Sequence, residues 1–126
     1  MALTATRLIW IDCIAGAVVG ALVLSLREWL ARLYALPTDL LFVIGIANLA
    51  YACVSCALAM RSTDGRVPFL RVVAVANIAW AVCCVVLAVV WFAEASVFGL
   101  GQLLGEAVFV GGLGVLEWRA AVRVQR

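Results

Sequence analysis

The chain has 126 residues, of which 68% are hydrophobic and 13% charged, and its mean hydropathy is +1.22. Soluble domains are about half apolar and a quarter charged, so this composition excludes an ordinary soluble protein and indicates one embedded in lipid. The net charge of +2, from nine arginines against seven acids, is too weak for a nucleic-acid surface. Lysine and histidine are absent, which argues against the commonest general base, against histidine as a haem or zinc ligand, and against lysine imine chemistry.

Four apolar stretches are long enough to cross a hydrocarbon core, which takes about 20 residues. They lie approximately at residues 8–26, 40–60, 69–92 and 97–117. The first follows a single arginine, Arg7, and lacks a small-x-small cleavage site, so we interpret it as a retained helix. The sequence therefore predicts an all-α integral membrane protein, a single domain of four transmembrane helices in an up-down bundle with short loops.

Three connections join these spans. Residues 27–37 are expected to form a short amphipathic segment that lies in the membrane interface and ends at Pro37. One helical face of that segment carries Trp29, Leu30, Leu33 and Tyr34. The second connection, residues 61–68, contains an Asp-Gly pair typical of a turn. The third, around Glu94, is so short that the spans beside it must be antiparallel.

The arginines indicate how the chain is oriented. Seven of them would lie on one side of the membrane, namely Arg7, Arg61, Arg66, Arg71, Arg119, Arg123 and Arg126. Only Arg27 and Arg32 would lie on the other side. Because short loops rich in arginine stay in the cytoplasm, both termini are predicted to be cytoplasmic, in a multi-pass protein of the inner (cytoplasmic) membrane.

A short pattern recurs in the second and third spans, at residues 46–56 and 75–84. It pairs Asn48 with Asn77, Tyr51 with Trp80, and Ser55 with Cys84. Steps of three and seven residues keep each set on one helical face, so each helix carries a narrow polar stripe. An internal duplication inverted in the membrane plane is one explanation, and chance similarity between Ala-rich helices is the other.

The fourth span carries a more costly group. Gln102, Glu106 and Glu117 share one face, and Glu106 falls near the middle of the bilayer. An ionised carboxylate there costs several kcal/mol unless it is paired, hydrated or protonated. Asp12 lies in the first span, closer to the cytoplasmic end. If these faces converge, they form a polar pocket. The alternative for the amides is that they are hydrogen-bonding glue between helices.

Glycines and cysteines add weaker signals. The spacings Gly16-xxx-Gly20 and Gly101-xxx-Gly105 are typical of close helix packing, between the first and fourth spans or with a second copy of the chain. The pair Cys53 and Cys56 is similar to the CxxC of four-helix membrane oxidoreductases. All five cysteines fall inside spans, however, so apolar filling is favoured over redox chemistry or a soft-metal site.

Two resemblances to known families are each confined to a few residues. The four-helix size and a membrane carboxylate are similar to small multidrug-type exporters, whose diagnostic glutamate lies in the first helix, where this chain has Asp12. The step from Asn77 to Trp80 resembles an Asn-x-x-Trp element of the tryptophan-rich sensory (translocator) family, but the prolines and aromatics that follow that element are missing. No functional residue is carried over from either family.

Two functional hypotheses follow from these observations. In the first, a mid-membrane site around Glu106 binds or transports a proton, a cation or a small amphipathic molecule, with Trp80 available for stacking or cation–π contact. The candidate site residues are Glu106, Asn48, Asn77, Tyr51, Trp80, Asp12 and Gln102. In the second, the protein is a non-catalytic scaffold or accessory subunit of a larger membrane complex.

Composition also limits the partners and the chemistry. The expected partners are membrane lipid, a small amphipathic ligand or cation, and a second copy in a dimer or another membrane subunit, with no nucleic acid. An enzyme is less favoured, because carboxylates alone would have to carry the reaction and no paired acid motif is visible. No cofactor or metal is expected.

Overall fold

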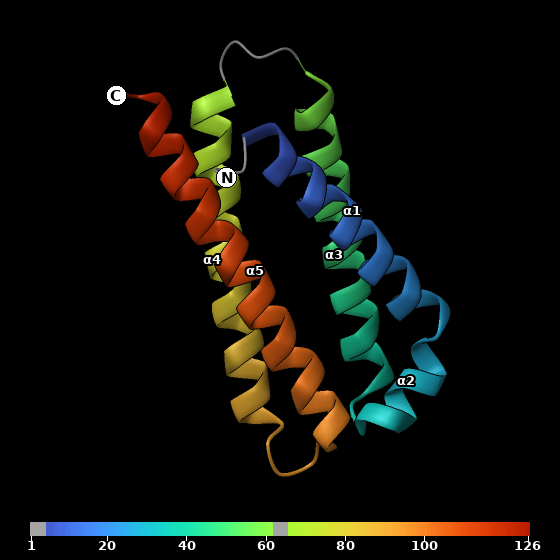
Figure 1. The fold of residues 1–126 in the computed structure, drawn as a ribbon. Coiled ribbons are helices and arrows are strands. Elements are labelled where there is room, and N and C mark those ends of the chain that lie inside the picture. The colour runs from blue at the N-terminus through green and yellow to red at the C-terminus, as the bar shows by residue number, and fades with distance from the viewer. Residues whose placement is uncertain (1–4, 62–65) are drawn as a thin grey trace.

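A computed structural model of the chain describes residues 5–61 and 66–126, which form five helices and no strands (Figure 1). The helices are α1 (Ala5–Ser25), α2 (Arg27–Tyr34), α3 (Thr38–Met60), α4 (Arg66–Val90) and α5 (Val97–Val124). Within this described part, α1, α3, α4 and α5 are each long and apolar enough to cross a membrane. The all-helical class and the four long apolar helices are thus confirmed, as in a small multi-pass membrane protein.

Several boundaries differ from those predicted. The last helix continues to Val124 rather than ending at 117. The prediction followed the apolar stretch, which ends where the arginines begin, whereas arginine is a good helix former and the helix continues through it. Helix α2 ends at Tyr34, where Ala35 adopts a left-handed conformation (φ 51°) and its N–H bonds to Ala31 O. Pro37 therefore precedes α3 instead of terminating α2. The predicted turn around Asp64 lies outside the described residues.

The long helices associate as two pairs, α1 with α3 and α4 with α5 (Figure 1). Contacts between the pairs are far fewer than contacts within them. Helix α2 lies at the end of the bundle where the turn between α4 and α5 also lies, and we call this the α2 end. Helix α1 begins, and α5 ends, toward the opposite end.

Helix α2 is fixed to the second pair by Ser96, which precedes α5. The Ser96 hydroxyl donates to Leu33 O at 2.6 Å, and the Ser96 N–H donates to Tyr34 O at 2.9 Å. The same hydroxyl accepts from the Gly99 N–H at 3.1 Å and caps the first turn of α5. Leu30 is buried in the cluster beneath α2, whereas Trp29 on the predicted apolar face is exposed.

Apolar clusters close the bundle at both ends. At the α2 end, Val23, Ile44 and Leu103 pack with Leu30 and their neighbours. At the opposite end, the cluster consists of Ile9, Ala59, Leu70 and Ala121. The buried polar side chains come between these clusters, and they are Asp12, Asn48, Ser55, Asn77, Glu106 and Glu117. The middle of the bundle is therefore its polar part.

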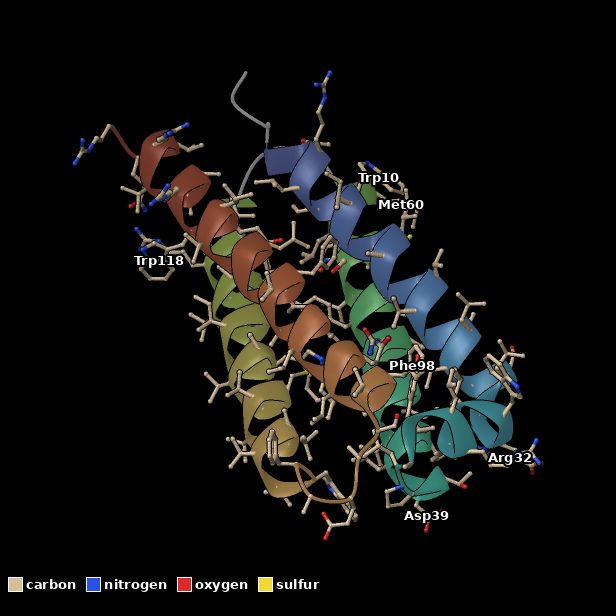
Figure 2. All side chains as sticks on the ribbon, turned by 60° about the horizontal axis from the view of Figure 1, so that its bottom comes forward. Trp10, Arg32, Asp39, Met60, Phe98 and Trp118 are labelled. Carbon is tan, nitrogen blue, oxygen red and sulfur yellow. The ribbon has the colours of Figure 1, made fainter. Side chains whose placement is uncertain are left out.

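The outer surface has the reverse character. Apolar side chains such as Trp10, Met60 and Phe98 are exposed on the long helices. Arg32 and Asp39 lie at the α2 end (Figure 2). Such an exterior suits lipid tails, and it leaves charged side chains at the ends where head groups and water would lie.

Glycines set the spacing within each pair. A Cβ added at Gly20 would lie 3.0 Å from Gly45 O, and one at Gly114 would lie 2.9 Å from Ala74 O. The α1 glycines thus pack against α3 rather than against α5. By contrast, a Cβ added at Gly101, Gly105 or Gly112 would meet no atom of the described residues within 4 Å.

We expect Gly114→Ala to destabilise the protein and Gly112→Ala to leave its stability nearly unchanged. The added methyl at position 114 would push α5 away from the Ala74 carbonyl, and overpacking of this kind costs about 1–3 kcal/mol. The two positions are two residues apart on one helix, so their change in helix propensity is matched. Thermal unfolding in detergent measures the difference, and equal melting temperatures for the two variants would contradict the packing described.

Candidate ligand site at Glu106

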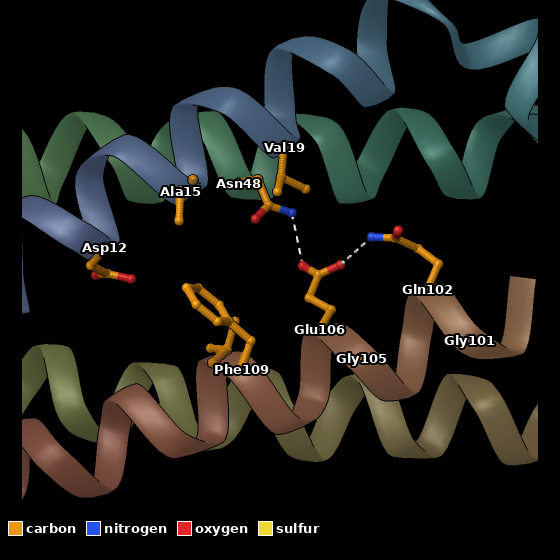
Figure 3. Close-up of a pocket in the computed structure, with 11 residues that line it drawn as sticks. Asp12, Ala15, Val19, Asn48, Gly101, Gln102, Gly105, Glu106 and Phe109 are labelled. Atoms are coloured by element: carbon orange, nitrogen blue, oxygen red, sulfur yellow. Dashed lines mark hydrogen bonds between the residues drawn. The ribbon is translucent and has the colours of Figure 1, made fainter. Parts of the chain in front are cut away.

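The Glu106 carboxylate is the centre of the polar middle, and its side chain is 8% exposed. Asn48 Nδ2, from α3, donates to Oε1 at 2.9 Å, and Trp80 Nε1, from α4, donates to the same oxygen at 2.7 Å. Gln102 Nε2, one turn away on α5, lies 3.4 Å from Oε2. Three helices therefore contribute to the surroundings of one carboxylate. Figure 3 shows the contacts that Asn48 and Gln102 make with it.

These three partners share a chemical character: each is a neutral N–H donor. Hydrogen bonds from neutral groups satisfy an anionic oxygen but leave its charge in place. Oε1 has two short bonds, whereas Oε2 has one long contact and can accept another donor. The site can thus receive one further hydrogen-bond donor at Oε2, and a cationic donor would also compensate the charge.

A cavity of about 230 Å³ lies beside this carboxylate, between α1, α3 and α5. Ala15 and Val19 of α1 line one side, and Phe109 of α5 projects into the gap (Figure 3). Gly101 and Gly105 form its α5 edge, and both lie on the exposed surface of that helix. Because these two residues have no side chains, the cavity opens sideways between α1 and α5.

A second cavity, of about 320 Å³, lies between α3 and α4. The two cavities share only Asn48 and Val110 in their linings, so these residues separate them. The Trp80 ring lines the second cavity and presents its N–H to Glu106. The aromatic ring that faces the Glu106 cavity is Phe109, which had no distinguishing feature in a sequence rich in apolar residues.

Tyr34 extends the polar contacts toward the α2 end. Its hydroxyl donates to Gln102 Oε1 at 3.3 Å, and Gln102 in turn approaches Glu106. Burial, together with the nearby Glu106 carboxylate, raises the pKa of Tyr34 above its ordinary value. The sequence had placed Tyr34 only on the apolar face of the interfacial segment, because its contact with Gln102 is 68 residues distant in the chain.

A second polar cluster lies about two to three helical turns further from the α2 end, since Ser55 follows Asn48 by seven residues and Glu117 follows Glu106 by eleven. Ser55 Oγ donates to Asp12 Oδ2 at 2.8 Å, and Asn77 Nδ2 donates to Glu117 Oε2 at 2.9 Å. Asp12 and Glu117 are 4% and 0% exposed. Asp12 also lines the Glu106 cavity, so the two clusters are joined through that space.

The predicted site residues thus fall into two groups. Glu106, Asn48, Trp80 and Gln102 are brought together by direct hydrogen bonds, and Asp12 faces the same cavity. The other two predicted residues lie outside this contact set. Asn77 binds Glu117, and the Tyr51 hydroxyl donates to Val73 O at 2.8 Å.

The two copies of the repeated pattern therefore have different partners. Asn48 bonds between the helix pairs, to Glu106, whereas Asn77 bonds within its own pair, to Glu117. Both asparagines are buried and face the interior, as their shared position in the pattern predicted. Their chemical roles diverge because the two helices have different neighbours.

All five cysteines are free. Cys13 and Cys84 are buried, Cys56 is half-buried, and Cys53 and Cys83 are exposed on the outer surface of the bundle. In the part of the chain that the structure describes, no group of three or more Cys, Asp or Glu side chains could hold a metal ion.

Comparison with known proteins adds no relative: no family model, curated protein sequence or solved structure matches this chain.

Glu106→Gln should lower the pKa of Tyr34, because it removes the negative charge that disfavours tyrosinate. The protein has two tyrosines, so in a Tyr51→Phe background the ultraviolet absorbance of tyrosinate during an alkaline titration reports Tyr34 alone. Burial remains in this variant, so we expect the pKa to stay above that of free tyrosine.

Glu28→Gln is the matched control, since it removes an exposed acid from α2 itself. It should leave the Tyr34 titration nearly unchanged. An identical titration curve for Glu106→Gln and its parent would contradict the influence of Glu106 on Tyr34 described here.

Proposed function

We propose that this protein binds an amphipathic molecule with a cationic head group, which enters from the bilayer and places that group against Glu106. The observation that carries the proposal is the uncompensated carboxylate: Glu106 is buried among neutral donors beside a cavity that opens sideways. An ionised group in the bilayer is costly and is found at functional sites by default.

The negative charge of the Glu106 carboxylate favours a cation as the ligand. The donors around Glu106 hold its carboxylate in place, and an ammonium group bonded to Oε2 would neutralise it in a medium of low dielectric constant. A neutral alcohol could make the same hydrogen bond but would leave the negative charge uncompensated. Discrimination between amine and alcohol is therefore the property that this site should have.

The size and the lining of the cavity beside Glu106 favour an amphipathic ligand. A volume of 230 Å³ is roughly that of seven or eight water molecules at about 30 Å³ each, enough for a head group and a few carbons. The apolar lining from Val19 and Phe109 suits methylene groups. The gap beside Gly101 and Gly105 would let the rest of an alkyl chain extend among lipid tails.

We also propose that the four long helices cross an inner membrane up and down, with both termini in the cytoplasm and the α2 end outside. The support is the excess of arginines at the ends opposite α2. A reporter active only in the cytoplasm should work when fused after Arg126 and fail when inserted at Glu94. The reverse result would invert the orientation.

The scaffold hypothesis has one observation in its favour. Gly101, Gly105 and Gly112 share a face of α5, and a Cβ on any of them would meet nothing among the described residues within 4 Å. A flat glycine face of this kind lets a second helix approach closely, so a dimer through α5 is the second candidate. In that case Glu106→Gln would be silent, and Gly112→Leu would convert the dimer into a monomer in native mass spectrometry.

Binding can be tested with decylamine, and with decanol as the neutral molecule of matched chain length. Radiolabelled probe is equilibrated with phosphatidylcholine vesicles that contain the protein, and protein-free vesicles of the same lipid measure simple partitioning. We expect saturable excess binding of decylamine but not of decanol. Glu106→Gln should weaken that binding at least tenfold, the equivalent of about 1.4 kcal/mol.

A pair of glycine variants tests the entrance to the cavity. Gly105→Leu places a side chain at the edge of the cavity and should reduce decylamine binding. Gly112→Leu adds the same side chain about two turns away on the same helix face, outside the cavity lining, and should not reduce decylamine binding.

Excess binding of decylamine that persists in Glu106→Gln, or that is absent from the wild type, would overturn the proposal.

A further inference from the structure

Asp12 and Glu117 form a second acidic site that the Glu106 site does not use. They come from α1 and α5, and the side chains between them come from α3 and α4: Ser55 is 0% exposed and Asn77 is 1% exposed. All four long helices thus contribute to a buried cluster. Two carboxylates in such a place require an explanation beyond helix association, since amides alone would serve that purpose.

Hydrogen bonding leaves this cluster short of donors. Ser55 supplies one bond to Asp12 Oδ2, and the Asn77 amide supplies one to Glu117 Oε2 and lies close to the Asp12 carboxylate as well. Glu117 Oε1 is buried and has no hydrogen-bond partner among the described residues. Two ionised carboxylates would offer about eight acceptor sites to these few donors.

The charges around Asp12 and Glu117 lead to the same conclusion as the hydrogen bonds. The groups near the two acids include Tyr51 and Ser55 from α3 and Asn77 from α4, together with the Cys13 thiol beside Asp12 on α1 and Glu106 further along α5. The Tyr51 hydroxyl is already bonded to Val73 O. Arg71, further along α4, places its guanidinium 5.7 Å from the centroid of the Trp118 ring and donates from Nη2 to Gln125. The two acids are thus held by neutral donors, and their negative charges repel each other.

We propose that Asp12 and Glu117 share one proton, and that this pair is a proton-binding site distinct from Glu106. Two interacting carboxylates in a desolvated site do not both ionise readily, and they bind a proton as a pair. One proton removes a negative charge and supplies the donor that the cluster lacks. The site does not depend on any ligand at Glu106, although Asp12 lines the Glu106 cavity and would sense a charge placed there.

Infrared spectroscopy tests this directly, because a protonated carboxyl group has a C=O stretch that a carboxylate lacks. The full chain is measured at neutral pH in an alkyl glycoside detergent, which contributes no ester carbonyl. Carboxyl groups in water are ordinarily ionised at neutral pH and give no such band. We expect the wild type to show one carboxylic acid band that shifts to lower frequency in deuterium oxide.

The variants assign the band to the pair. Asp12→Asn together with Glu117→Gln should abolish it, and each single substitution should shift or remove it. Asn and Gln keep an oxygen that can accept from Ser55 and Asn77, and circular dichroism checks that the helices are retained. Glu106→Gln should leave the band in place, so a failed ligand test at Glu106 would not affect this result.

Three outcomes would overturn the proposal. The first is a wild-type spectrum without a carboxylic acid band, which is decisive even if a variant fails to fold. The second is a band that is unchanged by Asp12→Asn, which would place the proton on Glu117 alone. The third is a band removed by Glu106→Gln, which would place the proton at the ligand site instead.

Discussion

The cost of placing a polar group in hydrocarbon is the constraint on which the rest of this structure depends. A lipid-facing carboxylate or amide has no water to bond with, so each such group must find its partners on neighbouring helices. Glu106 illustrates the result, since its oxygens receive N–H groups from α3, α4 and α5 itself. The buried polar side chains gather between two apolar clusters, which places the site at the middle of the bundle rather than at an end.

Two kinds of packing follow from this constraint and from the glycines. Within each helix pair, Gly20 and Gly114 allow backbones to approach closely, and contacts are dense. Between the pairs, contacts are fewer, and the bond from Asn48 to Glu106 crosses the space where they meet. Long polar side chains hold helices further apart than glycines do, so cavities remain on both sides of that bond. The open space beside Glu106 is thus a consequence of how the pairs are joined.

Much of this arrangement could be predicted from the sequence, and the parts that could not be predicted have physical reasons. Long apolar stretches give four helices because length and hydropathy alone determine whether a segment can cross a bilayer. The convergence of Glu106, Asn48 and Gln102 was predictable because a buried polar group without a partner is costly. The bond from the Trp80 N–H to Glu106 was not predicted, since the sequence suggested only stacking or cation–π contact for that ring. Whether Asn77 would bind Glu106 or Glu117 depends on which helices pair, and a polar stripe does not encode that. Phe109 and the open Gly105 edge give no signal, since apolar residues and glycines are common throughout these spans.

The site at Glu106 and the pair Asp12 and Glu117 differ in how many hydrogen-bond donors each carboxylate has. Glu106 has three neutral donors for one carboxylate, so its hydrogen bonds are largely met and only its charge remains, which suits a cation. Asp12 and Glu117 have a serine hydroxyl and one amide for two carboxylates, so both donors and positive charge are lacking, and a proton supplies both. Because Asp12 borders the cavity beside Glu106, a cation there would lower the cost of ionising Asp12. Under both proposals, ligand arrival would therefore favour release of the shared proton, and a proton held by the pair would weaken ligand binding by the same factor.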